Sequence, residues 1–358
     1  KAFESVKDSK KPVAVHIVTQ KGKGYAPAEK DKETWHWHMP FDPETGKSLY
    51  NSEGEDYGTV TCNYLLEKMQ ADKSVCAITS ATPTVFGFTP DVRKKAGKQF
   101  MDVGIAEEHA MALASGIAKN DGKPFYGVYS SFLQRTYDQL SQDVCINKSP
   151  VTIAVFAASV YGMSDVTHLG IYDIPMISNI PELVYLAPVT KEEYLAMLDW
   201  SLEQKEHPVA IRVPASLVSD GKPFTKDLSK LNKYEMTQKG SQVAVIALGS
   251  FYGVEAAKLI KEKTGVKATV INPYYITGID KEMLESLKAD HKTVITLEDG
   301  VLEGGFGEKI ARFYGDSDVK TLCFGLEKKF YDRYDPAEVL KENHLTPEQI
   351  AEDVIKTL

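Results

Sequence analysis

The sequence is poor in cysteine and has no long apolar run. Its four cysteines lie far apart, form no Cys-x-x-Cys pair and sit in apolar segments (Cys62, Cys76, Cys145, Cys323). This spacing excludes a disulfide framework and predicts reduced core thiols, as in a cytoplasmic protein. No segment approaches the ~20 apolar residues that cross a bilayer, and no secretory leader opens the sequence. We therefore expect a cytoplasmic protein without membrane contact.

Positive charge and the common nucleotide motifs are also scarce. The formal net charge is −8, and the short basic runs are broken by Gly, Pro or acidic residues, which argues against nucleic-acid binding. The sequence contains no Gly-x-Gly-x-x-Gly after the first strand, no phosphate-binding Gly-x-x-x-x-Gly-Lys-Ser/Thr and no His-Glu-x-x-His. These absences exclude the usual dinucleotide, P-loop and zinc-protease signatures.

Apolar runs of strand length alternate with helical stretches over most of the 358 residues. The length predicts two or three domains, and the alternation predicts an α/β fold with a doubly wound, mostly parallel sheet, followed by a smaller C-terminal α/β domain. We place the segments at residues 1–50, 51–225 and 239–358, with polar linkers at 51–58 and 219–240. The expected strands are 75–79, 99–103, 125–128, 151–156, 183–186, 209–213, 243–248, 268–271, 293–297 and 320–323.

The first segment begins inside an apparent helix (Lys1–Glu4) and continues into an expected strand over Pro12–Val18. A lone strand is not stable by itself. We therefore expect either a preceding segment or pairing with another polypeptide.

Glu107 lies between an apolar strand-like run and a helix rich in small residues. A carboxylate at such a junction faces backbone N–H groups and the positive end of the helix dipole, which would hold it in place. A plain helix-capping charge is the alternative.

Two further loops follow expected strands and carry reactive side chains. Tyr129, Phe132 and Arg135 lie in the first, and Asp165 and His168 in the second. Ligands collect at the carboxyl ends of strands in such sheets. Taken singly, the aromatic rings could be core residues, Arg135 a surface ion pair and His168 a satisfied polar side chain.

Histidines and glycines elsewhere give weaker signals. His16 lies in the expected first strand, and His36 and His38 alternate with tryptophans but lack a third ligand at suitable spacing. We expect no metal site there and favour a loop facing substrate or cofactor. Gly304–Gly307 precedes a helix and either binds an anion or allows tight packing.

These motifs together resemble the 1-deoxy-D-xylulose-5-phosphate synthases, within the transketolase group of thiamine diphosphate enzymes. Residues 104–109 resemble the family's Ala-Glu-Gln-His motif, and residues 129–139 are close to its Tyr-Ser-Thr-Phe-Leu-Gln-Arg-Ala-Tyr-Asp-Gln. Residues 167–170 with Asp173 match its Thr-His-Gln-Gly and later Asp. His16, residues 19–29, His36 and residues 41–43 are similar to the end of its first domain.

The resemblance implies three domains: the C-terminal end of a diphosphate-binding domain (1–50), a pyrimidine-binding domain (51–225) and a transketolase C-terminal domain (239–358). It implies a transferase that condenses pyruvate, with loss of CO₂, with glyceraldehyde 3-phosphate to 1-deoxy-D-xylulose 5-phosphate for isoprenoid precursor synthesis. Thiamine diphosphate and Mg²⁺ are the implied cofactors, and a homodimer is the implied assembly.

The resemblance also implies roles for individual residues. Glu107 would hydrogen-bond the aminopyrimidine ring, Phe132 would stack on it and Tyr129 would shape the pocket. The implied catalytic residues are Glu107, His168, His16 and His36; the implied cofactor contacts are Glu107, Phe132, Tyr129 and Arg135; the implied substrate contacts are Tyr129, Arg135, Asp165 and His168.

The chain departs from the family pattern in its acceptor half. Ala157 and Ala215 stand where the family has phosphate-binding arginines, and Ser164 precedes Asp165 where the family has the acid one position earlier. Arginine forks are the usual grip on phosphate. A transketolase-like enzyme with a different, unphosphorylated acceptor and an inactive paralogue are therefore the alternatives.

A second departure concerns the diphosphate and Mg²⁺. The family's Gly-Asp-Gly motif and later Asn ligand have no match in these residues. We expect the metal ligands outside this chain, in a missing segment or in a separate N-terminal fragment or subunit.

Overall fold

The computed structural model describes residues 1–49, 54–216, 218–249 and 251–358. The chain divides into two compact units, Lys1–Gly54 and Glu55–Leu358. No helix in these described ranges is long and apolar enough to cross a bilayer.

The first unit contains two short helices, α1 (Ala2–Val6) and α2 (Ala26–Lys30), and an isolated bridge between Phe41 and Ser48. The expected strand over Pro12–Val18 is wrong, because residues 12–20 are irregular. The side chains of Val13, Ile17 and Val18 are 47%, 60% and 84% exposed. Apolar alternation predicted a strand, but within this unit the segment has no neighbouring strand to complete its hydrogen bonds.

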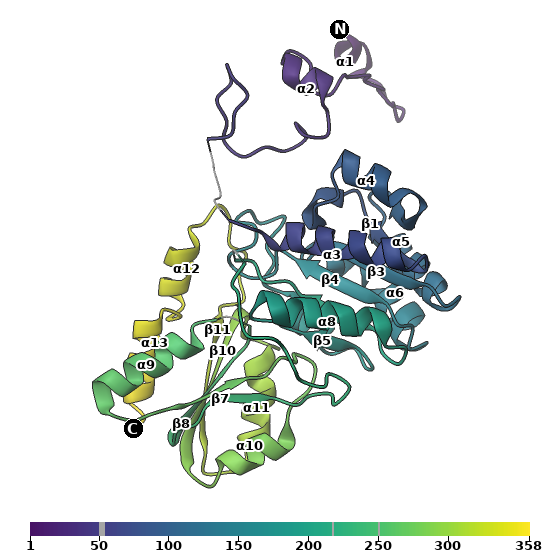
Figure 1. The fold of residues 1–358 in the computed structure, drawn as a ribbon. Coiled ribbons are helices and arrows are strands. Elements are labelled where there is room, and N and C mark those ends of the chain that lie inside the picture. The colour runs from purple at the N-terminus through teal and green to yellow at the C-terminus, as the bar shows by residue number, and fades with distance from the viewer. Residues whose placement is uncertain (50–53, 217, 250) are drawn as a thin grey trace. The chain divides into compact units, whose positions relative to one another are not determined.

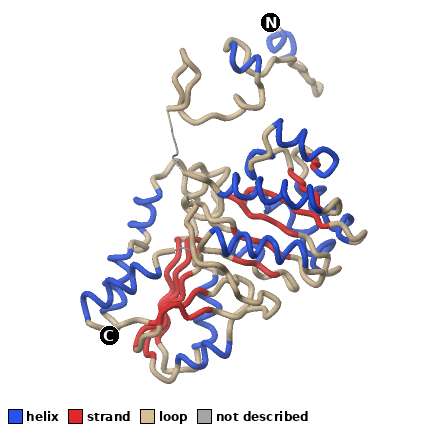
Figure 2. The backbone as a smooth tube through the Cα atoms, viewed as in Figure 1, coloured by secondary structure: helices blue, strands red, loops and turns tan. Residues whose placement is uncertain are grey.

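The second unit is built on two sheets, seen as separate groups of arrows in Figures 1 and 2. The first has six parallel strands in the order β2-β1-β3-β4-β6-β5, and the second has five in the order β11-β10-β8-β9-β7. In the second, only β7 is antiparallel. The α/β fold class with a mostly parallel sheet is thus confirmed.

The first sheet's strands are short and fully or mostly buried, as expected of parallel strands covered on both faces. They are β1 (Val75–Thr79), β2 (Phe100–Asp102), β3 (Lys123–Tyr129), β4 (Thr152–Phe156), β5 (Val184–Leu186) and β6 (Val209–Arg212). The helical elements between and before them are α3 (Tyr57–Ala71), η1 (Pro83–Phe86), α4 (Pro90–Ala96), η2 (Gly97–Gln99), α5 (Glu107–Ala118), η3 (Phe132–Thr136), α6 (Tyr137–Gln139), η4 (Leu140–Cys145), α7 (Asp173–Ile177) and α8 (Lys191–Glu203).

Helices cover both faces of this sheet. The buried side chains of α5 pack with Ile78, Tyr126 and Ile153 on one face, whereas those of α3 and α8 pack with Val75, Phe125 and other residues on the other. Two helices are fixed at their start by capping side chains: Asp56 accepts the N–H of Thr59 at 2.8 Å, and Thr190 caps α8.

The second sheet follows a linker and carries helices on its faces. Its strands are β7 (Glu235–Gln238), β8 (Gln242–Ala247), β9 (Thr269–Asn272), β10 (His291–Val301) and β11 (Lys320–Leu326). Its helices are α9 (Gly253–Thr264), α10 (Lys281–Leu287), α11 (Phe306–Tyr314), α12 (Pro336–Glu342) and α13 (Pro347–Ile355). Strand β7 lies inside the stretch expected to be a linker.

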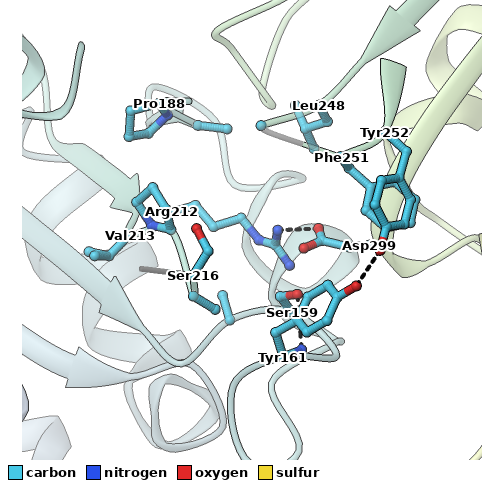
Figure 3. A pocket seen from close by; sticks show the side chains of 15 residues that line it. Ser159, Tyr161, Pro188, Arg212, Val213, Ser216, Leu248, Phe251, Tyr252 and Asp299 are labelled. Atoms are coloured by element: carbon cyan, nitrogen blue, oxygen red, sulfur yellow. Dashed lines mark hydrogen bonds and ion pairs between the residues drawn. The ribbon is translucent and has the colours of Figure 1, made fainter. Parts of the chain in front are cut away.

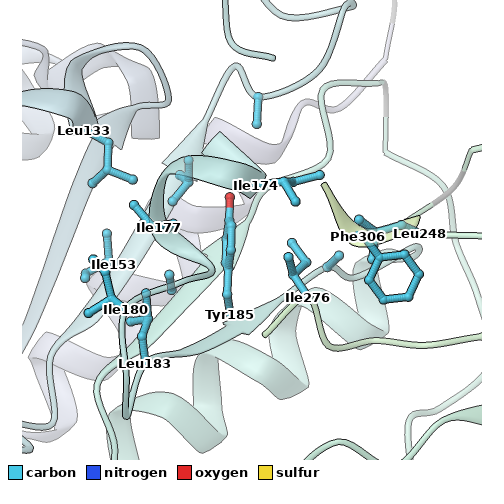
Figure 4. Packing of buried hydrophobic residues seen from close by; sticks show 14 of the residues in the cluster. Leu133, Ile153, Ile174, Ile177, Ile180, Leu183, Tyr185, Leu248, Ile276 and Phe306 are labelled. Atoms are coloured by element: carbon cyan, nitrogen blue, oxygen red, sulfur yellow. The ribbon is translucent and has the colours of Figure 1, made fainter. Parts of the chain in front are cut away.

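One apolar cluster joins the two halves of the unit. Figure 4 shows Ile174, Ile177 and Tyr185 of the first half close to Ile276 and Phe306 of the second. Because this core is shared, the loops at the carboxyl ends of the first sheet are held against the second half.

Candidate active site

Glu107 is the first residue of α5 and follows the turn after β2. Asp102 accepts the N–H groups of Ala81 and Gly104, both at 2.9 Å, which fixes that turn. Glu107 is only 2% exposed. Its N-cap, Ala106, has no side-chain capping bond, so the helix start is open towards the carboxylate.

One oxygen of this carboxylate lacks a hydrogen bond. Oε2 of Glu107 is buried with no hydrogen-bond partner among the described residues, although Nη1 of Arg135 lies 3.0 Å away. Charge contact without hydrogen-bond alignment accounts for both observations. A buried acceptor left in this state costs free energy unless a ligand completes it.

Three rings gather at the ends of β3 and β4. The centroids of Phe132 and His168 lie 5.1 Å apart, those of Tyr129 and Phe132 5.5 Å, and those of Tyr129 and His168 6.1 Å. Burial raises the pKa of Tyr129 above its usual value, so its hydroxyl stays neutral at physiological pH. The cluster offers flat apolar faces beside an imidazole.

Asp165 orients His168. The Nδ1 of His168 lies 3.0 Å from Oδ1 of Asp165, and Thr167 donates its hydroxyl to the same oxygen at 2.5 Å. Burial opposes ionisation of Asp165, but these hydrogen bonds outweigh it and hold its pKa below the ordinary value. A carboxylate there favours the proton on Nδ1, so Nε2 is the nitrogen that can accept a proton.

The expected residues of this unit therefore fall into two groups. Glu107 and Arg135 form a charged pair, and Tyr129, Phe132, His168 and Asp165 form the ring cluster. Phe132 and Arg135 share η3 and so link the groups. His16 and His36 belong to the unit Lys1–Gly54, where His36 contacts Lys21; their part in the site stays a prediction.

A buried ionic network beside the site escaped the sequence reasoning. Arg212 donates Nε to Asp173 Oδ2 at 2.8 Å and also bonds Asp299 of β10. Tyr185 donates its hydroxyl to Asp173 at 2.5 Å. Asp299 is 87 residues from Arg212 in the sequence, so no local pattern could have paired them.

The glycine turn before α11 favours packing over anion binding. The N–H groups of Phe306 and Gly307 donate to the carboxylate of buried Glu298 at 2.9 and 2.8 Å. A Cβ on Gly305 would lie 2.6 Å from that carboxylate. Glu298 thus occupies the place an anion would take.

Comparison with known proteins agrees with this arrangement. Residues 55–220 match the family model of the transketolase pyrimidine binding domain, and residues 232–350 match that of the transketolase C-terminal domain. The fold and the site thus define a transketolase-like α/β protein.

Curated relatives narrow the assignment. A 1-deoxy-D-xylulose-5-phosphate synthase of Clostridium perfringens (strain 13 / Type A) is 37% identical over 360 residues, covering 98% of this chain and 57% of the relative. One of Lachnoclostridium phytofermentans is 37% identical over 352 residues, covering 96% and 55%. The chain belongs to the 1-deoxy-D-xylulose-5-phosphate synthase family, and it spans little more than half the length of these relatives.

Solved structures share the fold. A chain titled split gene transketolase, inactive beta4 tetramer, has a TM-score of 0.73 at 23% identity, covering 83% of this chain and 96% of that one. A Pichia stipitis transketolase in complex with sedoheptulose 7-phosphate has a TM-score of 0.67 at 16% identity, covering 93% and 50%.

Proposed function

We propose that this chain is the pyrimidine-binding and C-terminal part of a thiamine diphosphate-dependent carboligase of the 1-deoxy-D-xylulose-5-phosphate synthase type. Pyruvate is the donor, and glyceraldehyde 3-phosphate is the acceptor that the family predicts. The observation that carries the proposal is the buried Oε2 of Glu107, which has no hydrogen bond and lies beside a cluster of flat rings.

These residues fit the pyrimidine half of the cofactor. A ring nitrogen would complete the hydrogen bonding of Glu107, and the face of Phe132 would stack on the ring. When bound, thiamine diphosphate supplies the carbanion chemistry that allows pyruvate to lose CO₂. Glu107 would then hold or release a proton at Oε2.

The other residues act on the substrates. His168, oriented by Asp165, would move a proton at Nε2, and Tyr129 and Arg135 would line the substrate space. His16 and His36 are proposed to bind hydroxyls or relay protons. Mg²⁺ remains part of the proposal, with ligands outside residues 1–358.

Glu107→Gln tests the assignment, because Gln keeps the shape but cannot take up a proton. In the complete protein with thiamine diphosphate and Mg²⁺, we expect CO₂ release from pyruvate to fall by ~10²–10⁴-fold. Glu67→Gln, an exposed position on α3, is the matched control and should keep the wild-type rate. An unchanged rate in Glu107→Gln would refute the proposed role of the carboxylate.

The domain limits (1–50, 51–225, 239–358), the homodimer and the cytoplasmic location are part of the same proposal. A separately encoded first part is supported by the similar extent of the split-gene transketolase chain, of which 96% is covered. Light scattering combined with intact-mass measurement of the expressed protein would give both subunit mass and stoichiometry. A monomer of full-length relatives' size would contradict both assembly statements.

An acceptor other than glyceraldehyde 3-phosphate is the second candidate. It is favoured by Ala157 and Ala215, which replace the two arginines that the family resemblance predicts.

A further inference from the structure

A cavity of about 240 Å³ lies between the two halves of the second unit (Figure 3). It is smaller than the pockets that hold drug-sized ligands, so it suits a molecule of a few carbon atoms. The lining residues used below are Ser159, Tyr161, Arg212, Ala215, Phe251, Tyr252 and Asp299.

The wall of this cavity is continuous with the candidate active site. The N–H of Ser159 donates to the carbonyl of Gly170 at 2.8 Å, which closes the loop that carries His168. Ser130, next to Tyr129, donates its hydroxyl to the same carbonyl at 3.4 Å. One loop therefore forms a wall of the cavity and also positions the imidazole.

The charge of the cavity does not suit a phosphate. Among the described lining residues only Arg212 and Asp299 are ionised types, and Arg212 is bonded to Asp299 and to Asp173 behind it. Two carboxylates against one guanidinium leave a formal charge of about −1, as the signs of these groups require. A phosphate would have to enter against this charge and lose its water without a free cation to replace it.

The remaining lining offers hydroxyls and apolar surface. Figure 3 shows Tyr161 of the first half reaching Tyr252 of the second, with their hydroxyl oxygens 2.5 Å apart. Ser159 adds a third hydroxyl, and Phe251 an apolar ring. Hydroxyl groups of this kind hydrogen-bond an uncharged hydroxyaldehyde without requiring charge.

We infer that this cavity binds the acceptor of the proposed reaction, and that the acceptor is a short, uncharged hydroxyaldehyde without a phosphate group. The inference depends on the proposed carboligation. The C1–C2 bond of pyruvate breaks and releases CO₂, a bond forms between its C2 and the aldehyde carbon, and the aldehyde oxygen takes up one proton. No oxidant or reductant is required.

The test compares D-glyceraldehyde with D-glyceraldehyde 3-phosphate in the complete protein with thiamine diphosphate, Mg²⁺ and pyruvate. We expect kcat/KM for D-glyceraldehyde to equal or exceed that for the phosphorylated aldehyde. Ala215→Arg places a cation in the lining and should shift the ratio towards the phosphorylated aldehyde by about tenfold or more. Ala289→Arg, at an exposed position after α10, is the matched control and should leave the ratio unchanged.

A binding measurement separates this inference from the proposed function. Saturation-transfer NMR should show D-glyceraldehyde bound to the wild-type protein, weakened by about three- to tenfold in Tyr161→Phe, while inorganic phosphate gives no signal. Absence of CO₂ release from pyruvate would refute the proposed function and leave this binding result intact. A wild-type preference for the phosphorylated aldehyde, or phosphate binding in the wild type, would overturn the inference.

Discussion

Ala157, directly after β4, has a backbone conformation that side chains seldom adopt. Its φ is 52°, in the left-handed region, and Ser159 two residues later has a φ of 98°. Gly162 and Gly170 pack so closely on Ala157 that a Cβ on either would lie 2.1 or 2.0 Å from its carbonyl oxygen. The loop between the cavity and His168 is therefore held in a strained shape by its neighbours.

Ala157→Gly should relieve part of this strain. The left-handed conformation costs an L-residue roughly 1–2 kcal/mol, against an entropic cost of glycine of roughly 0.5–1 kcal/mol. We expect urea unfolding to show a gain of about 0.5–1 kcal/mol from the difference between these two costs. The same substitution at Ala158, which is buried and has no positive φ, should lower stability instead; equal effects at both positions would contradict the strain argument.

Glu298 should make stability depend on pH. Burial raises its pKa from 4.5 to about 8, against the lowering effect of the N–H groups of Gly307 and Phe306 and of Arg212, and with Asp299 as a further raising charge. Because the folded pKa exceeds the unfolded one, the folded state binds more protons between these values. Stability from this group is therefore full below about pH 4.5 and is lost as pH rises towards 8.

Glu298→Gln removes this titration. Between pH 5 and 7.5 we expect the wild type to lose at least ~1 kcal/mol of unfolding free energy relative to the variant, since one pKa unit is worth ~1.4 kcal/mol. Glu308→Gln, exposed on the same helix α11, should follow the wild type. Nearby Lys309 has a pKa lowered by burial to about 8 and titrates above this window. Parallel pH curves for wild type and Glu298→Gln would rule out the assigned burial effect.

At the scale of elements, helix α5 links packing to the carboxylate at its start. Ala110, Ala114 and Ala118 lie four residues apart and are all buried against the sheet. Small side chains let the helix approach β1 and β3 closely, which keeps Glu107 below the surface.

Ala114→Leu should overpack this contact. Added methylenes in a close-packed core cost about 1–3 kcal/mol, so thermal and urea unfolding should both report a loss in this range. Ala112→Leu, on the half-buried side of the same helix, should cost less. The reverse order would show that the α5–sheet contact has room to spare.

The sequence predicted the elements whose pattern is local and missed those that depend on neighbours. Continuous apolar runs such as Val75–Thr79 and Val151–Phe156 predicted β1 and β4, because strands covered on both faces need apolar residues throughout. Strand β7 has a half-exposed, polar sequence and is recognised only by its antiparallel pairing with β9 at the sheet edge. Residues 12–18 show the opposite error: a strand pattern without a strand to pair with.

At the scale of the whole molecule, the two halves of the second unit meet through a buried ion network. Arg212 at the end of β6 bonds Asp173 of α7 and, across the domain boundary, Asp299 of β10. Motif spacing brought Glu107, Phe132 and His168 into one predicted site, because each lies next to the end of a strand in one sheet. It could not predict Asp299 or Tyr252, because these come from a different sheet.

This network should couple the stability of the two halves. Arg212→Leu leaves Asp173, which is 1% exposed, without its cation, and breaking a buried ion pair costs about 3–5 kcal/mol. Asp299→Asn keeps the Arg212–Asp173 pair and should cost less, about 1–3 kcal/mol for one hydrogen bond to a charged group. Asp316→Asn, exposed in the C-terminal half, should cost nothing measurable. Calorimetry and urea unfolding check this order, and in Arg212→Leu we expect the two halves to unfold in more widely separated transitions, since the hydrophobic contact alone then joins them. If Asp299→Asn proved as costly as Arg212→Leu, the bond between the halves, and not the burial of Asp173, would dominate the network.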